Sequence, residues 1–506
     1  MNALYRLMML STMISFRSFH IRALVAAKSG TSGSAAATAA TATSATSSSS
    51  SAVVSGVSHI LKTPHELRVV QVQIVHRHGD RTPITPLLNE SYWASELVPD
   101  ELSQRVASST TILRDDSPHK ILHLAGGRGP FGKLTQLGLL QMVQVGTELR
   151  EQLVLEEHRH DDATISHTID EHGHVHWNRG RLFCAATNPL HPSKIKVMST
   201  DFPRTIQSVQ GTLVGLFPDP ADTIATPITV DARHTNHLIP DPQPRQSVEQ
   251  EELERSLGSR PHLRAVETTM KDLAMQTTQS LRHLLGDDAF AVSFGVGEEN
   301  DDKNGTTTTT TTKRTKELKK KLSWAQLSEI TKCLQTRDML PASITPEMQQ
   351  AISKHTAWRW FENLRHPRLA FLSMNTMAKT MIVQAMHDRI EELAGGGESS
   401  TSDDVPLLYL YSAHDSTLIG LLCAFRLEQP AEWPEYGSYF KVELIEAKPL
   451  TGDDEGAAAA VQYLVRFSLN GEVLRCKWED CDEALHMIPV DLLSHYVTTK
   501  GATSLE

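Results

Sequence analysis

The chain has 506 residues, of which 40% are hydrophobic and 22% are charged, values typical of a globular protein with a sizeable core. Its formal net charge of −11 disfavours nucleic acid or an anionic membrane surface as a partner, so an anionic ligand must be held by local cations. No run of about 18 apolar residues is present, and we expect no membrane-spanning helix. The five cysteines do not form a disulfide framework or a zinc motif, although Cys476 and Cys481 are close enough to pair.

The first 65 residues resemble a targeting segment followed by a low-complexity linker. They contain no Asp or Glu, several Arg and Lys, and a Ser/Thr/Ala/Gly-rich tract over residues 29–58. This composition is typical of an organelle transit peptide, and we expect a mitochondrial location. Besides a terminus with no targeting function, the alternative is a secretory signal with residues 7–16 as its apolar core, leading to the secretory pathway or a lysosome-like compartment. Arg17 and Arg22, which follow that core, weigh against it.

Strands and helices alternate along the rest of the chain. Val/Ile-rich or apolar runs predict strands, and apolar residues at helical spacing predict helices. The expected strands cover 67–75, 195–199, 405–411, 439–445 and 462–469, and the expected helices cover 134–153, 205–217 and 416–425. This order predicts an α/β fold, with a mixed, mostly parallel sheet and helices on both faces.

The stretch 235–393 has a helical pattern with polar loops. We expect it to be an inserted α-helical subdomain between two parts of one α/β domain, 66–234 and 394–506. Within it, residues 295–321 contain seven consecutive threonines between charged patches, and we expect a disordered loop there. The Gly/Ser-rich residues 395–404 and the acidic and Ala-rich residues 451–460 are interpreted as two further surface insertions.

Three of the expected strands end in residues that can hold or attack a phosphoryl group. The three segments are Arg77-His78-Gly79-Asp80-Arg81-Thr82-Pro83, Ser199-Thr200-Asp201-Phe202-Pro203-Arg204-Thr205 and Ser412-Ala413-His414-Asp415. Because ligands gather at the carboxyl ends of parallel strands, we expect these segments to lie close together. Arginine forks match phosphate oxygens two at a time, and an imidazole can act as a nucleophile, acid or base. Each segment also precedes or opens a predicted helix, whose N-terminal amides favour an anion.

The same segments resemble the histidine acid phosphatases, branch 2 of the histidine phosphatase superfamily. Residues 77–83 match R-H-G-x-R-x-P, residues 132–141 match G-x-L-T-x-x-G-x-x-Q, residues 199–205 match S-T-D-x-x-R-T, and residues 414–415 are the H-D pair. The four blocks occur in the order of the family, and the resemblance covers residues 66–493 between the insertions. It implies the α/β fold expected above.

The resemblance also implies a role for each of six residues. His78 would attack phosphorus and form a phosphohistidine. Asp415 would protonate the leaving alcohol, for which its carboxyl must carry a proton, and would then help to activate water. The phosphate oxygens would be bound by Arg77, Arg81, Arg204 and His414. No metal and no cofactor is implied.

Single residues at these positions also have structural interpretations. Arg204 alone could be a helix-start cation, His414 a core histidine, and Asp415 the N-cap of the helix from residue 416, while Thr135 is interpreted as an N-cap rather than a ligand. The histidine-rich stretch 158–176, with acidic residues nearby, could suggest a metal site. We interpret it instead as a solvated loop or an edge hairpin, since metal ligands need an ordered shell.

The expected activity is hydrolysis of a small phosphate monoester in acid. A lysophospholipid, lysophosphatidate, is one candidate substrate, because residues 124–127, residues 408–415 and the Cys476/Cys481 spacing resemble the members that hydrolyse it. Asp80 and the S-T-D block instead resemble the prostatic and lysosomal acid phosphatases. Phytase or sugar-phosphate phosphatase activity, an inactive phosphate-binding protein and a phosphoglycerate-mutase-like isomerase are the alternatives. The sequence defines no oligomeric state.

Overall fold

The computed structural model describes residues 65–115, 127–155, 164–165, 167–169, 175–177, 182–184, 190–218, 227–240, 247–286, 289–291, 321–395, 405–428, 432–449, 461–478 and 485–502. The predicted targeting segment, nearly all of the three predicted insertions, and Cys481 lie outside these ranges. Their proposed location, disorder and pairing therefore stay predictions.

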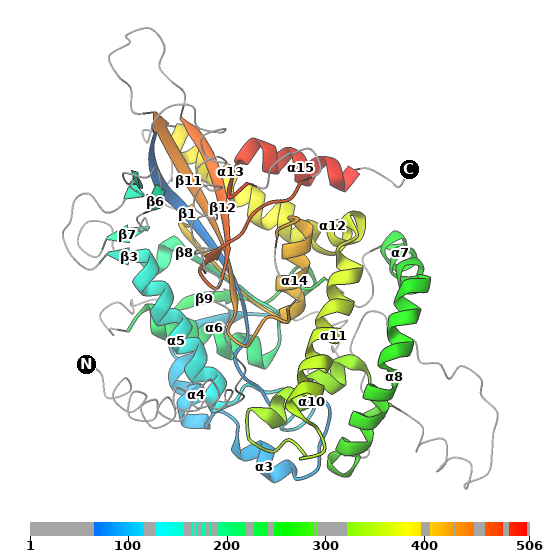
Figure 1. Cartoon of the computed structure of the whole chain (residues 1–506). Helices are drawn as coiled ribbons and strands as arrows, with labels where there is room; N and C mark the ends of the chain where they lie inside the picture. Colours follow the sequence, from blue (N-terminus) through cyan, green and yellow to red (C-terminus); the bar gives the residue numbers. More distant parts are fainter. Residues whose placement is uncertain are drawn as a thin grey trace, which may run out of the picture.

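A mixed sheet occupies the centre of the described structure (Figure 1). It has ten strands, eight of them in the order β13-β12-β11-β1-β10-β8-β9-β2. The parallel strands are β1 (His65–Arg77), β10 (Leu408–Ala413), β8 (Ile195–Ser199), β9 (Ile228–Asp231) and β2 (Thr110–Leu113). The antiparallel strands are β11 (Tyr439–Pro449), β12 (Gln462–Leu469), β13 (Glu472–Val473), β14 (Met487–Pro489) and β4 (Thr164–Ile165). The predicted mixed α/β sheet is confirmed.

Helices cover both faces of this sheet (Figure 1). One face is covered by α5 (Gln136–Leu153) and α6 (Pro203–Leu216). The other is covered by α11 (Pro346–Leu364), α12 (Pro367–Asn375), the π-helical η6 (Thr376–Val383), α13 (Gln384–Ala394), α14 (Asp415–Ala424) and α15 (Val490–Ala502). Alternate side chains of a strand point to opposite faces, so Leu408 and Leu410 of β10 enter the α5/α6 core and Tyr409 and Tyr411 enter the other.

A third core lies among helices at one end of the molecule. It joins α10 (Trp324–Gln335), α8 (Pro261–Leu281) and α11 to Trp93 of α3 (Glu90–Ser95) and to Phe131. The other helices are α4 (Asp100–Ala107) and α7 (Val248–Gly258), with short 3-10 turns η2 (Pro192–Lys194), η3 (Thr235–His237), η4 (Arg282–Leu284) and η5 (Ala289–Ala291). The described part of 235–393 is thus helical, whereas its status as a separate subdomain stays a prediction.

Two small strand pairs lie outside the main sheet: β3 (Val154–Leu155) with β7 (Phe183–Cys184), and β5 (His167–Ile169) with β6 (Val175–Trp177). The second is an antiparallel pair within the histidine-rich stretch, as expected for a hairpin. Within the described ranges, no group of three or more His, Cys, Asp or Glu side chains could hold a metal ion. No described helix is both long and apolar enough to span a bilayer.

Candidate active site

The three predicted segments meet at one edge of the sheet because their strands are parallel and in register. Arg77 of β1 lies opposite Ala413 of β10, and Ser412 of β10 lies opposite Ser199 of β8. The six predicted site residues therefore come together, although they are up to 338 positions apart. All but Asp415 are almost fully buried, with exposed fractions of 4% for Arg77, 2% for His78, 6% for Arg81, 3% for Arg204 and 8% for His414. We call Arg77, Arg81, Arg204 and His414 the cationic clamp.

The His78 imidazole is held through one of its two nitrogens. Its Nδ1 donates to the Gly79 carbonyl at 2.8 Å, and because a carbonyl can only accept, Nδ1 carries the proton and Nε2 carries the lone pair. The His414 ring lies with its centroid 5.6 Å away. Burial, followed by the charges of Arg204, Arg77, His414 and Arg81, lowers the pKa of His78 well below its usual value. This shift favours the neutral, nucleophilic form of the ring.

Within the described part of the chain, the Nε atom of each of the three clamp arginines has no hydrogen-bond partner. Arg77 uses Nη2 to reach Asp415 Oδ2 at 2.8 Å and Nη1 to donate to the Pro434 carbonyl. Arg81 Nη1 contacts Glu329 Oε2 at 2.8 Å, and Arg204 Nη1 donates to the Gly132 carbonyl at 3.4 Å. The three buried Nε atoms have no hydrogen-bond partner among the described residues. Because an unpaired buried donor is unfavourable, these atoms indicate a site for an anion with several acceptor oxygens.

The charges of the clamp are only partly balanced. Burial and the charge of Arg81 lower the pKa of Arg204 to about 9, and Asp415 and Glu329 offset this only in part. Burial alone would lower the pKa of Arg81 too, but the ion pair with Glu329 raises it. Burial also raises the pKa of Tyr436 well above its usual range, so this phenol is neutral and Glu329 is the charged partner of Arg81. An oxyanion would restore the balance.

His414 and Asp415 stand at the start of α14. His414 is the N-cap residue, and its Nε2 lies 3.0 Å from the Thr200 hydroxyl. Asp415 is the first helical residue, so the helix begins one position before the predicted 416 and Asp415 is not its N-cap. Its Oδ1 accepts from the Ser416 amide at 2.8 Å, and its Oδ2 accepts from Arg77 and from the Trp433 indole at 3.1 Å. With 19% of its side chain exposed, Asp415 is the site residue nearest to solvent.

The G-x-L-T-x-x-G-x-x-Q segment supports the loop that carries His78. Thr135 is the N-cap of α5, as predicted, and its hydroxyl accepts from the Gly138 amide at 3.0 Å. A Cβ on Gly79 would lie 2.2 Å from the Gly138 carbonyl oxygen, and a Cβ on Gly138 would lie 2.1 Å from the Asp80 carbonyl oxygen. Gln141 accepts from the Asp80 amide at 2.8 Å. Direct contact between the main-chain segments at Gly79 and Gly138 thus fixes the loop that carries His78.

Several residues at the site were not predicted. Glu329 comes from α10, and Arg337, in the turn just after α10, contacts the buried carboxylate of Asp80 at 2.7 Å. Trp433 and Tyr436 come from the loop after α14, and the Arg77 guanidinium lies 4.1 Å above the Tyr436 ring. Glu329 lies 248 positions from Arg81, and no motif in the sequence connects them.

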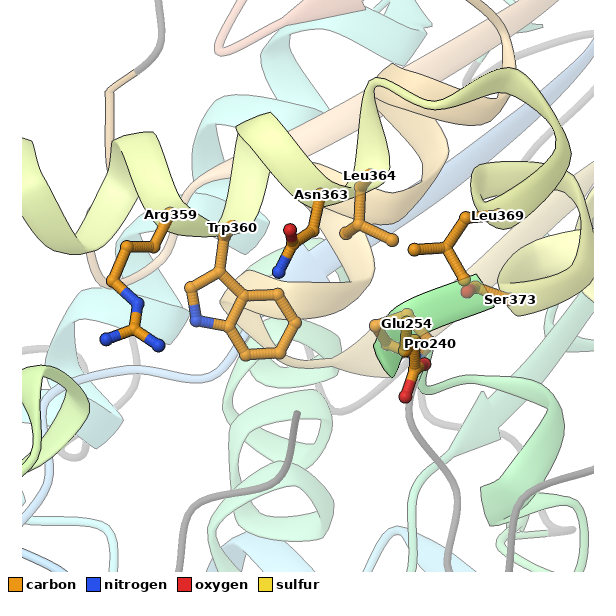
Figure 2. Close-up of a pocket in the computed structure, with 8 residues that line it drawn as sticks. All are labelled: Pro240, Glu254, Arg359, Trp360, Asn363, Leu364, Leu369 and Ser373. Carbon is orange, nitrogen blue, oxygen red and sulfur yellow. The ribbon is translucent and has the colours of Figure 1, made fainter. Parts of the chain in front are cut away.

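A pocket lies between α7, α11 and α12 (Figure 2). Its lining residues are Pro240, Glu254, Arg359, Trp360, Asn363, Leu364, Leu369 and Ser373. The Trp360 ring is 6.3 Å, centroid to centroid, from the ring of Trp433, whose indole binds Asp415. Trp360 of the pocket lining is thus linked to Asp415 through Trp433.

Comparison with known proteins identifies the family. The histidine phosphatase superfamily (branch 2) matches residues 68–470, and the chain belongs to this family. It is 24% identical over 442 residues to counting factor 60 of Dictyostelium discoideum, covering 84% of each chain. It is 23% identical over 399 residues to lysophosphatidic acid phosphatase type 6 of Homo sapiens, covering 75% of this chain and 74% of that protein. The phytase structure from Citrobacter braakii is 12% identical with a TM-score of 0.45, covering 86% of this chain and 98% of that one.

The protein is therefore a phosphatase, a phosphoric monoester hydrolase of the histidine acid phosphatase type.

Proposed function

We propose that the protein hydrolyses phosphate monoesters in acid through a phosphohistidine formed on His78. The observation that carries this proposal is the arrangement of three buried arginines, whose Nε atoms have no hydrogen-bond partner among the described residues, around an imidazole whose Nδ1 donates to Gly79 and whose Nε2 carries the lone pair. Such a site binds the oxygens of a phosphoryl group while presenting a nucleophile to phosphorus. Preorganised cations stabilise the charge spread over these oxygens in the transition state.

The reaction then has two displacements. In the first, the Nε2 lone pair of His78 forms a bond to phosphorus, the bond to the leaving oxygen breaks, and Asp415 transfers its proton to that oxygen. In the second, water attacks phosphorus, Asp415 accepts a proton from the water, and the phosphorus–Nε2 bond breaks to release phosphate. The contacts of Asp415 with Trp433 and Arg77 hold its carboxyl at the rim of the site, where a leaving alcohol departs.

Hydrolysis of p-nitrophenyl phosphate at pH 5 tests the proposal. Wild-type protein should turn over, and His78→Ala should lose at least about a thousandfold in kcat, because loss of a covalent nucleophile removes the whole pathway. Asp415→Asn should lose more on glycerol phosphate than on p-nitrophenyl phosphate, whose leaving group needs no proton. A folded wild-type protein that hydrolyses no monoester would contradict the proposal and favour a phosphate-binding protein. Transfer of phosphate to a second sugar hydroxyl would favour an isomerase.

We propose lysophosphatidate as the substrate, on two supports. The relative from Homo sapiens carries that activity in its name. The pocket linked to Asp415 through Trp360 and Trp433 has Trp360, Leu364 and Leu369 in its lining, which offer apolar surface to a lipid substrate. Phytate would need several further cations, whereas the pocket lining contains one, Arg359, which is engaged with Glu267 at 3.1 Å.

A substrate panel tests this choice: lysophosphatidate, phytate, sugar phosphates and phosphotyrosine, each with wild type and Trp360→Ala. We expect the highest kcat/KM for lysophosphatidate, and a selective loss on that substrate, of about tenfold, when the pocket wall is truncated. Equal losses on all four substrates would indicate that Trp360 only supports Trp433. A preference for phytate would replace lysophosphatidate as the proposed substrate.

We propose a mitochondrial location from the composition of the first 65 residues, which lack acidic residues and contain spaced arginines. The full chain with a C-terminal fluorescent tag should colocalise with a mitochondrial marker, and removal of residues 1–64 should abolish this. Secretion of the tagged chain would support the alternative signal instead.

A further inference from the structure

Glu329 is a buried acidic residue beside the cationic clamp that the proposed reaction does not use. Its carboxylate accepts three hydrogen bonds, each of 2.8 Å: Arg81 Nη1 and the Ile84 amide donate to Oε2, and the Thr85 amide donates to Oε1. Only 6% of the Glu329 side chain and 7% of the Arg81 side chain is exposed. A carboxylate at this depth needs charged and backbone donors, and these three supply them.

This contact leaves one edge of the Arg81 guanidinium open. Nη1 donates to Glu329 and, at 3.0 Å, to the Thr82 carbonyl, while Nε has no partner among the described residues. Among the described residues, no hydrogen bond involves Nη2 of Arg81. Nε and Nη2 lie side by side on a guanidinium and can donate to two oxygens of one anion. Arg368 does this in the same protein, with Nε and Nη2 each 2.7 Å from a Glu249 carboxylate oxygen.

The backbone donors fix the direction of the Glu329 carboxylate. Ile84 and Thr85 directly follow the R-H-G-x-R-x-P segment, so the loop that ends at Pro83 is tied to α10 through the same side chain that holds Arg81. Both carboxylate oxygens are occupied by protein donors and face Arg81 and the loop. Glu329 can therefore orient Arg81 without contacting a bound phosphoryl group.

We propose that Glu329 is a positioning residue: it holds Arg81 by Nη1, so that the Nε–Nη2 edge faces the equatorial oxygens of the phosphoryl group during transfer. This inference rests on the proposed phosphatase function, and it gives α10 a part in the reaction. A clamp arginine that is fixed in advance stabilises the transition state more than one that must be ordered by the substrate.

The test compares Glu329→Gln with Glu443→Gln in the full-length protein. Glu443 is an equally buried carboxylate, with 5% of its side chain exposed. It lies on β11, away from the clamp, and is paired with Lys441 of the same strand and with Arg466 of β12. For each protein we would measure kcat and KM with p-nitrophenyl phosphate, inhibition by inorganic phosphate and by vanadate, and the melting temperature. Vanadate adopts the trigonal bipyramidal arrangement of the transferring group and reports transition-state fit, whereas phosphate reports ground-state binding.

Glu329→Gln should lower kcat/KM and vanadate affinity by about ten- to a hundredfold, and phosphate affinity by a smaller factor. Glu443→Gln should lower the melting temperature with little change in the other quantities. The proposal is overturned if the two variants change kcat/KM and the vanadate-to-phosphate ratio alike, because Glu329 would then only stabilise the fold.

If Glu329→Gln does not fold, Glu329→Asp serves instead, since it keeps the charge but shortens the reach to Arg81. An intermediate loss of vanadate affinity supports the proposal, and wild-type affinity contradicts it. Failure of the proposed function is seen separately, as a wild-type protein that hydrolyses no monoester. Normal wild-type turnover with an unaffected Glu329 variant contradicts the positioning role alone.

Discussion

Two buried charge clusters in this protein differ in how completely they are neutralised. In the first, Glu443 lies between Arg466 at 2.8 Å and Lys441 at 3.0 Å, and Glu443 and Arg466 are directly opposite each other on paired strands. These charges, after the cost of burial, lower the pKa of Glu443 to about 2. In the second, the cationic clamp leaves Arg204 with a pKa of about 9 and three Nε atoms without hydrogen-bond partners among the described residues. The first cluster is complete in the protein alone, and the second needs a ligand.

The difference separates structural from functional burial of charge. A buried ion pair that satisfies itself contributes to the fold or to its specificity. A buried set of cations that repel one another lowers the free energy of unfolding, a cost that is common at sites that bind anions. Substitutions in the two clusters should therefore have opposite effects on activity and stability.

The largest effect is expected for Arg204→Met. It should lower kcat/KM by about a hundred- to a thousandfold, the usual consequence of losing one preorganised donor to developing charge. The free energy of unfolding without phosphate should stay equal or rise, because the substitution relieves repulsion with Arg81. Steady-state kinetics and urea unfolding of the ligand-free protein measure the two quantities. A variant that loses several kcal/mol of stability would show that the clamp is also structural.

The converse result is expected for Arg466→Met. Removal of this cation leaves the Glu443 carboxylate with Lys441 alone, and breaking such a buried pair costs about 3 kcal/mol. Activity per folded molecule should match wild type at a temperature where both proteins are folded. Urea unfolding and an active-site titration check this expectation. A large fall in kcat per active site would mean that the two clusters are coupled.

The smallest effect is expected on the pH dependence of stability. His76, next to the clamp residue Arg77, and Glu443 should lose their contributions to the free energy of unfolding in different pH ranges. His76 precedes Arg77 on β1, and burial lowers its pKa from 6.5 to about 4, with a partial offset from its hydrogen bond to the Arg77 carbonyl. The unfolded chain takes up this proton more readily than the folded one. The contribution of His76 is therefore present above pH 6.5 and is lost as the pH falls towards 4, by about 2 kcal/mol at pH 5.

Glu443 behaves differently, since its lowered pKa gives a contribution that is present above pH 4.5 and lost as the pH falls towards 2. Urea unfolding between pH 7 and pH 4 should therefore show His76→Asn with a flatter decline than wild type from pH 6.5 to 5. Arg466→Met should run parallel to wild type over that range. Parallel curves for wild type and His76→Asn would contradict the assignment.

Much of the sheet could be predicted from the sequence, and so could the four residues of the cationic clamp together with His78 and Asp415. Local sequence patterns define the strands and these six positions. Val/Ile-rich runs predicted β1 and β8, and parallel strands place their carboxyl-end residues together. The motifs around Arg77, Arg204 and Asp415 follow these strands directly, so their positions could be predicted from the strands. Thr135 could be predicted as a cap because an N-cap has a local signature.

The partners of those residues could not be predicted in this way. Glu329 is one polar residue on a helix with an ordinary amphipathic pattern, and charged helix positions are usually solvent-exposed. Only the packing of α10 against the loop after His78 turns this side chain inwards. The Trp433 indole meets Asp415 through an irregular segment, for which no periodicity exists. Contacts that depend on tertiary packing leave no local pattern.

The direct contact between Gly79 and Gly138 has a consequence for how this protein can diverge. Each glycine faces a backbone carbonyl, and no change of a neighbouring side chain can make room for a methyl group. Second-site suppressors of a Gly79 or Gly138 substitution should therefore be absent from a saturating library, although suppressors of ordinary core substitutions are common. The position of His78 therefore depends on two main-chain segments, around Gly79 and Gly138, that can diverge only if both change together.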